Sequence, residues 1–486
     1  MVPKFTALLL IGGLLATAEG IWSQESTVEQ LQELQELRNE VERRRGDMRR
    51  ELRLLHQVLG EDERVGQLGE YERSLQSLTP DELAAELRIL REDIERLRQQ
   101  VERPDEVGEK PRFTVTGQIR NRLEWTDKDF TSGDGDVVEL LRSRLRVTAR
   151  PQDETTIVVE VQDARLWGDE VNTLDGAAGQ LDFHQAYLKL ENMFGQPPFT
   201  VTVGRQELAY GSERLIGAVG WSNTGRAFDA LRLRFGAESN GELFVAKLEE
   251  KGMRDRNLWG LEGHLERGSH AAEPYVLFEH DKGVATDRLR RATAGLRGVG
   301  EFVNATGHVL GYELEGAGQV GDDGLDEIKA FMAGGRLSYQ GPGWNRPYVT
   351  AGLDYLSGDS TVGDNQIKVF DTLFATNHKF YGLMDLFTNI PTHTSERGLS
   401  DIYLKGELSA SESTRLALHI HSFSLAKSAG EKNMGQEADV LLTHTLTAVT
   451  SLQWAGMIFV PGDAMKALSG GEDPAFKMYL QMTARF

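Results

Sequence analysis

Arginines are the residues of this 486-residue chain whose type and spacing point most directly to a chemical task. Of the 25 arginines after residue 111, 13 lie within residues 112–234. Five of them recur at every second position in two short segments: Arg120, Arg122, Arg142, Arg144 and Arg146. A spacing of two places side chains on one face of a β-strand, and the planar guanidinium binds carboxylates through two parallel hydrogen bonds. The pattern therefore predicts a basic surface that binds anions.

Other chemistry has little support in the sequence. The absence of cysteine excludes disulfide scaffolds, cysteine nucleophiles and cysteine-ligated metals. His419 and His421 lie two apart, but no histidine has a metal-ligand spacing. No Gly-x-Ser-x-Gly motif is present. We therefore expect no enzyme activity, catalytic residue, cofactor or metal.

Two runs of carboxylates are the nearest approach to a metal site. They comprise Asp127, Asp129, Asp134 and Asp136, and separately Asp322, Asp323, Asp326 and Glu327. Oxygen ligands of this kind could hold calcium, but the spacing matches no EF-hand loop. Solvated acidic loops on the extracellular side are the favoured interpretation.

The elements that carry the arginines are predicted to be strands. Within residues 112–125 the odd positions are mostly apolar and the even positions are all polar, which is the period-two pattern of a strand with one apolar and one wet face. The alternation recurs through residue 486, and we count 18 candidate strands over residues 112–486. Connections after even strands are short, at 150–154, 236–241, 341–345 and 410–413, whereas the long ones, 127–136, 207–225 and 358–399, follow odd strands. An even number of long alternating strands with short turns at one end predicts an antiparallel outer-membrane β-barrel.

Composition supports this interpretation over two alternatives. The formal charge of −21, from 75 acidic and 54 basic residues, argues against nucleic-acid binding. The only long apolar run is at the N-terminus, which excludes a multi-helix membrane protein, whereas barrel strands average to a neutral hydropathy such as the −0.39 found here. A soluble β-sandwich rarely needs so many long strands.

The N-terminal part of the chain is predicted to be a signal peptide followed by helices. Residues 1–18 contain Lys4, an apolar core and a small-residue cleavage pattern, with cleavage that could extend to about residue 24. Residues 26–103 carry apolar side chains every three or four positions, typical of a periplasmic α-helical coiled coil, and residues 104–111 form a linker. Self-association or docking to a periplasmic partner is favoured, with a hairpin folded on itself as the alternative.

The last strand carries a second signal. Apolar and polar residues alternate up to the C-terminal Phe486. A terminal phenylalanine on an amphipathic strand resembles the signal that the barrel-assembly machinery of bacterial outer membranes recognises. We therefore expect the barrel in the bacterial outer membrane, with outer-membrane lipid and lipopolysaccharide around it.

Residues 203–234, with the sequence VGRQELAYGSERLIGAVGWSNTGRAFDALRLR, resemble the alginate-export family of outer-membrane barrels. Residues 378–387 (HKFYGLMDLF) and 435–439 (GQEAD) are similar to it too. The resemblance implies an 18-stranded barrel with an electropositive conduit for a polyuronate. It carries over to the family's polar and charged positions, here Arg205, Glu207, Arg214, Arg226, Asp229 and Arg232. The N-terminal heptad segment departs from the simplest members of the family.

The predicted function is passive passage of an anionic polysaccharide, alginate-like, or of related acidic solutes through an arginine-lined lumen. Arg234 belongs to the same set of inward arginines. Glu124 is an acid that would keep the arginines from binding an anionic solute permanently. Alternatives are a salt-bridge lattice that stiffens the wall, a general porin, and an envelope-organising protein that uses the barrel as its anchor.

Two points concern residues 201–225. Arg205 and Glu207 share strand parity with Val203 rather than with Thr202, so an inward Arg205 would need a bulge near Gly204. Residues 207–225 are unusually apolar for a free loop. We expect them to fold into the barrel and narrow it.

Overall fold

The computed structural model describes residues 112–486 except 132, 134, 169–180, 194–197, 252–253, 283–287 and 362. The predicted signal peptide, the helical segment 26–103, the linker 104–111 and Asp134 lie outside the described residues. None of the helices in the described part is long and apolar enough to cross a membrane.

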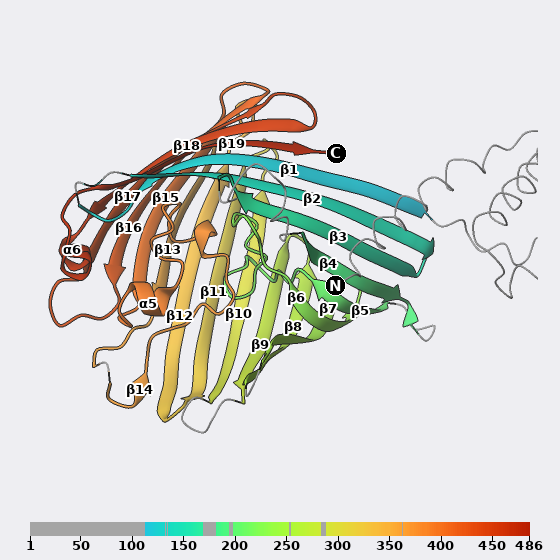
Figure 1. Cartoon of the computed structure of the whole chain (residues 1–486), viewed down its shortest axis with the longest axis horizontal. Helices are drawn as coiled ribbons and strands as arrows, with labels where there is room; N and C mark the ends of the chain where they lie inside the picture. The colour runs from blue at the N-terminus through green and yellow to red at the C-terminus, as the bar shows by residue number, and fades with distance from the viewer. Residues whose placement is uncertain are drawn as a thin grey trace, which may run out of the picture. The chain divides into compact units, whose positions relative to one another are not determined.

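The described chain is a meander of antiparallel strands (Figure 1). The strands are β1 (Arg112–Asp127), β2 (Asp136–Gln152), β3 (Thr155–Leu166), β4 (Asp182–Glu191), β5 (Phe199–Gln206), β6 (Phe228–Gly236), β7 (Asn240–Lys251), β8 (Arg254–Arg267), β9 (His270–Asp281), β10 (Leu289–Val303), β11 (Val309–Asp323), β12 (Asp326–Gln340), β13 (Tyr348–Leu356), β14 (Gln366–Ile367), β15 (Leu399–Ser409), β16 (Thr414–Leu425), β17 (Asn433–Thr445), β18 (Thr450–Pro461) and β19 (Ala475–Arg485). The helices are η3 (Asn377–Lys379), α5 (Ile390–His393) and α6 (Asp463–Ser469).

The sheet closes because β1 pairs with both β2 and β19. The two-residue β14 lies outside this ring: it pairs in parallel with β12, while β13 pairs directly with β15. The barrel therefore has 18 strands, which confirms the predicted fold. Phe486 completes the seam, where its backbone exchanges two hydrogen bonds with Gly117 of β1.

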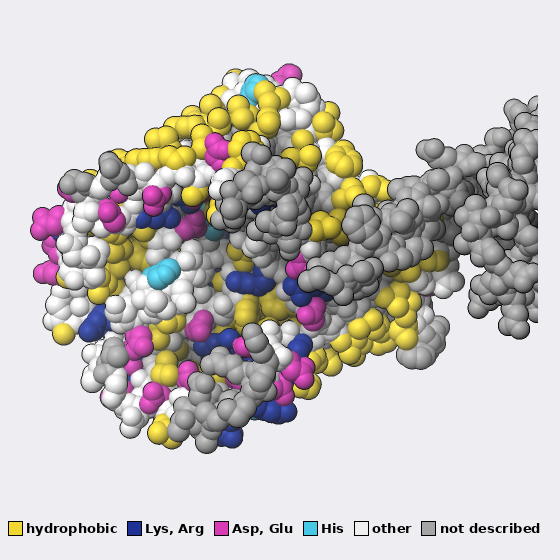
Figure 2. Space-filling view, in the orientation of Figure 1, with side chains coloured by type: hydrophobic (Ala, Val, Ile, Leu, Met, Phe, Trp, Pro, Cys, Tyr) yellow, Lys and Arg dark blue, Asp and Glu magenta, His cyan; other side chains and the backbone are white. Residues whose placement is uncertain are grey.

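The two faces of the wall follow the period-two pattern. On β1 the side chains of Phe113 and Ile119 are 63% and 51% exposed on the outer face, whereas Arg120 and Arg122 are each only 4% exposed. Figure 2 shows apolar side chains over the outer wall and charged side chains gathered in the opening. The outward apolar band matches the hydrocarbon of the membrane, so the polar side chains must face the lumen.

The lumen contains a packed hydrophobic core, in which two long connections pack against inward side chains of the strands. Residues 207–227, between β5 and β6, and residues 357–398, between β13 and β15, run inside the wall (Figure 1). They bury many side chains there. Fully buried examples are Leu208, Ile216, Phe370, Met384 and Ile390. These two segments are together termed the plug. The expected insertion of residues 207–225 into the barrel is thus part of a larger structure.

Candidate functional site

The two segments of the plug are joined through their backbones. Gly217 N donates to Phe374 O, and Phe374 N donates to Leu215 O, each at 2.8 Å. Ile216 and Phe374 form an isolated parallel bridge. The Arg226 guanidinium also donates to the Phe374 carbonyl. Because each segment satisfies polar groups of the other, we expect them to be ordered together.

Arginines of β1 and β2 hold one edge of the plug. Arg120 donates to Gly220 O at 3.0 Å and to Ser222 O at 2.9 Å, and Arg142 donates to the same two carbonyls at 3.2 and 3.0 Å. Arg122 donates to Trp221 O at 3.1 Å and pairs with Glu124 at 3.2 Å. Among the described residues, neither Arg120 nor Arg142 has an ion-pair partner. Their charges face neutral carbonyls and amides.

Trp221 is the central side chain of this edge. The Arg122 guanidinium lies 3.8 Å from the centre of its ring, and the His378 imidazole stacks on it at 4.3 Å with an interplanar angle of 5°. The indole Nε1 donates to Asp385 at 3.2 Å. Trp221 thereby connects the arginines, the first plug segment and the second.

The second plug segment is anchored on the opposite side of the β1–β19 seam. Lys477 of β19, only 2% exposed, pairs with Asp385 at 2.7 Å and donates to Leu383 O at 3.1 Å. Glu437 of β17 accepts the Met384 N–H at 2.8 Å. Buried polar side chains of the wall thus bind backbone atoms of this plug segment and hold it against β17 and β19.

His378 makes this anchor sensitive to pH. Its Nδ1 lies 2.6 Å from Asp385 Oδ1. Burial lowers the pKa of His378 below its usual 6.5, and the nearby charges of Lys477 and Arg122 act in the same direction. Burial alone would raise the pKa of Asp385, but the hydrogen bond and charge of His378 and the charge of Lys477 place it well below its usual range.

We expect the plug to loosen as the pH falls from about 7.5 to about 5.0. A released His378 binds a proton more readily than the buried one, so the stabilisation is present above about pH 6.5 and is lost as the pH drops below it. Hydrogen exchange of residues 377–389, corrected for its intrinsic pH dependence, measures this effect. His378→Gln should abolish most of the difference, and equal pH dependence in that variant would contradict the prediction.

Arg214 anchors the first plug segment from within. Its guanidinium pairs with Asp354 of β13 at 2.8 Å and with Glu315 of β11 at 3.2 Å. All three side chains are at most 5% exposed. Arg214 also lies 4.2 Å from the Phe380 ring centre. The sequence placed this arginine among the conduit residues, and in the structure its charge is compensated by two buried carboxylates of the wall.

The remaining candidate arginines are mostly paired with carboxylates on the inner wall. Arg146 donates to Glu160 at 2.6 Å, Arg144 lies 3.4 Å from Glu207, and Arg232 forms two hydrogen bonds with Glu242. Arg234 is exposed and has no ion-pair partner among the described residues. The salt-bridge lattice considered above thus describes the flanks of the arginine cluster better than its centre.

Arg205 and Asp229 occupy a different position. They are register partners, in line with Val203 and Leu231, whose side chains are exposed on the outer face. The register of β4 with β5 continues without a bulge. The two side chains pair at 3.1 Å and are 38% and 61% exposed. We therefore leave Arg205 and Asp229 out of the lumenal set proposed below.

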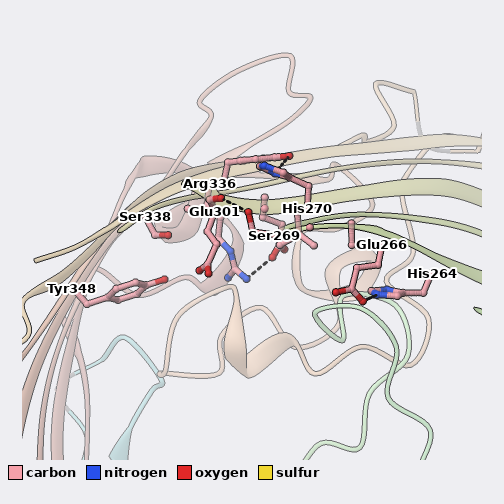
Figure 3. Close-up of a pocket in the computed structure, with 15 residues that line it drawn as sticks. His264, Glu266, Ser269, His270, Glu301, Arg336, Ser338 and Tyr348 are labelled. Carbon is pink, nitrogen blue, oxygen red and sulfur yellow. Dashed lines mark hydrogen bonds and ion pairs between the residues drawn. The ribbon is translucent and has the colours of Figure 1, made fainter. Parts of the chain in front are cut away.

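At the end of the barrel with the short turns, the lumen has a groove beneath the plug. Three adjoining cavities of about 410, 440 and 440 Å³ follow the wall from β4 to β13. Figure 3 shows the first, where Arg336, Glu301, His270 and Tyr348 line one cavity. The carboxylates of the groove are Glu191, Glu207, Glu238, Glu242, Glu262, Glu266, Glu273, Glu301 and Glu313, and its cations are Lys189, Arg232, Arg234 and Arg336. This region is acidic overall, in contrast to the arginine cluster.

Several functional residues were missed by the sequence analysis. Residues 358–399 were predicted only as a long connection after an odd strand, and the anchors Lys477, Asp385 and Glu437 were not singled out. The apolar density that indicated insertion of residues 207–225 is also present in residues 369–390 and could have revealed the second segment. Asp385 and Glu437 lie within residues 378–387 and 435–439, the two further segments that resemble the family. Their contacts could not be predicted, because the partners lie far away in the sequence.

Comparison with known proteins gives a family and a fold. Residues 112–474 match the family described as Alginate export. Among solved structures, OprD from Pseudomonas aeruginosa, an outer membrane protein, is similar with a TM-score of 0.56 and 10% identity over 77% of this chain and 94% of that chain. OccAB4 from Acinetobacter baumannii has a TM-score of 0.55 and 13% identity, over 79% of this chain and 100% of that one. None of the curated proteins matches the sequence.

Proposed function

We propose that this chain, which belongs to the Alginate export family and is an outer-membrane barrel for the passage of solutes, passively conducts acidic solutes. Alginate-like polyuronates are the proposed substrate class. Transport channels of this kind carry out no covalent chemistry. We further propose that Phe486 engages the barrel-assembly machinery, that lipopolysaccharide surrounds the outer face, and that residues 26–103 dock to a periplasmic partner or to a second copy.

The observation that carries the proposal is the uncompensated arginine cluster at the edge of the plug. Arg120 and Arg142 face each other in the β1–β2 register, and both lack a carboxylate partner in the described part of the chain. Guanidinium groups in a confined lumen raise the local concentration of anions. Carboxylates of a passing solute would form stronger, charge-assisted hydrogen bonds than the neutral carbonyls do.

The acidic groove favours a second candidate, a general porin with weak charge preference. Its glutamates outnumber its lysines and arginines. The groove would therefore repel a polyanion unless the arginine cluster had already bound it. In the proposed conduit, the glutamates of the groove favour release of a solute that has passed the arginine cluster. In a general porin they cancel the effect of the arginines.

Ion selectivity of the full chain in planar bilayers separates the two. Under a potassium chloride gradient we expect the reversal potential to indicate a several-fold preference for chloride, and we expect oligomers of galacturonate to block the current. Neutral galactose oligomers of equal length are the control and should block much less. Cation preference without block by the uronate would overturn the proposal.

A further inference from the structure

The strongest unexplained contact in the barrel is the one between charged arginines and a neutral backbone. Arg120 and Arg142 both donate to Gly220 O and Ser222 O, over distances of 2.9 to 3.2 Å. Two guanidinium groups therefore converge on the same two oxygens, and a guanidinium binds the two oxygens of a carboxylate through paired hydrogen bonds. Arg122 adds a third donor on the carbonyl between them, that of Trp221.

This contact leaves charge uncompensated. The three arginines are each 4% exposed, and among the described residues only Arg122 has an acidic partner, Glu124, which lies 3.2 Å from its Nε. The Nε atom of Arg120 is buried and has no hydrogen-bond partner in the described part of the chain. Burying cations against neutral dipoles is unfavourable compared with pairing them with an anion. The site thus has the composition of an anion site that is filled by a neutral occupant.

The occupant is also held in an unfavourable conformation. Val219, just before the three carbonyls, has φ of 50°, in the left-handed region that β-branched residues avoid. Gly220 is exposed, and a Cβ placed on it would meet nothing within 4 Å. The turn therefore depends on its contacts rather than on its own preference, and within the described part of the chain there is free space beside Gly220.

We propose that the carbonyls of residues 220–222 occupy the anion site of Arg120, Arg122 and Arg142 in place of a carboxylate, so that an acidic solute competes with this turn and releases it from the wall. This inference rests on the proposed function, because it adds substrate-dependent release to the same arginines. When the turn is displaced, the arginines exchange neutral carbonyl acceptors for charged carboxylate oxygens. The backbone of Val219 can then leave its unfavourable left-handed conformation. A solute without a carboxylate offers the arginines no charged acceptor, so it leaves the turn in place.

The chain contains no cysteine, so Ser222→Cys provides a single site for a spin label. The carbonyl of residue 222 remains, and the lost Ser222 hydroxyl contacts only Thr224. In the full chain in lipid vesicles, we expect sodium galacturonate to raise the mobile fraction of the label several-fold, and galactose to leave it unchanged. Arg120→Gln with Arg142→Gln should make the label mobile without ligand and insensitive to galacturonate.

Arg150→Gln is the matched control, because it removes an arginine from the exposed periplasmic end of the same strand. It should keep both the immobile label and the response. A label that stays immobile while galacturonate permeates overturns this inference and leaves the proposed function standing. If galacturonate neither permeates nor moves the label, both proposals fail.

Discussion

Deletion of residues 211–220 is expected to raise the single-channel conductance several-fold. This segment contributes Leu215 and Ile216 to the lumenal core and carries the backbone contacts with Phe374. Without it, the second plug segment loses the hydrogen bonds that orient it. A constriction limits the current through a pore, so its loss should dominate the change.

The barrel should survive this deletion. β5 and β6 are adjacent and pair up to Gln206 and Phe228, and adjacent strands are only about 4.8 Å apart. Residues 207–210 and 221–227 remain and easily span that distance. Conductance in planar bilayers is the measurement, and the shift of electrophoretic mobility on heating reports folding. Deletion of residues 428–431, from the exposed turn between β16 and β17, is the control and should leave conductance unchanged. An unaltered current in the 211–220 deletion would rule out a plug that narrows the lumen.

Replacing Arg214 by methionine is expected to have the largest effect of any single substitution. The change leaves Asp354 and Glu315 buried without their cation, at 1% and 5% exposure. Removing one member of a buried ion pair typically costs about 3–5 kcal/mol. We expect that loss in the free energy of opening of the plug, because the arginine belongs to the plug and its partners belong to the wall.

Hydrogen exchange of residues 211–219 measures the free energy of opening, and exchange of β11 and β13 shows whether the wall is affected. Arg205→Met is the matched control. It breaks the exposed pair with Asp229 at 3.1 Å, which is worth about 0–1 kcal/mol. Equal protection of the plug in the two variants would show that Arg214 does not anchor it.

The position of the plug could be anticipated in part. The apolar residues Leu215, Ile216 and Trp221 suggested insertion of residues 207–225, because apolar side chains on a loop need a surface to cover them. Residues 369–390 have a similar density of apolar side chains. The inward direction of Arg120 and Arg142 also follows from parity with apolar neighbours that face lipid. Their acceptors do not follow, because a backbone carbonyl has no sequence signature.

The sequence by itself determined the strands, their number and which face of each meets the membrane. Side chains alternate with a period of two whatever a strand pairs with, so the pattern survives in the sequence. The tertiary structure alone decided which charges are neutralised. Arg214 meets Asp354 across 140 residues and Trp221 meets Asp385 across 164. Such contacts arise only when the closed barrel brings distant segments of the chain into one lumen, where an unpaired buried charge or polar group would be costly.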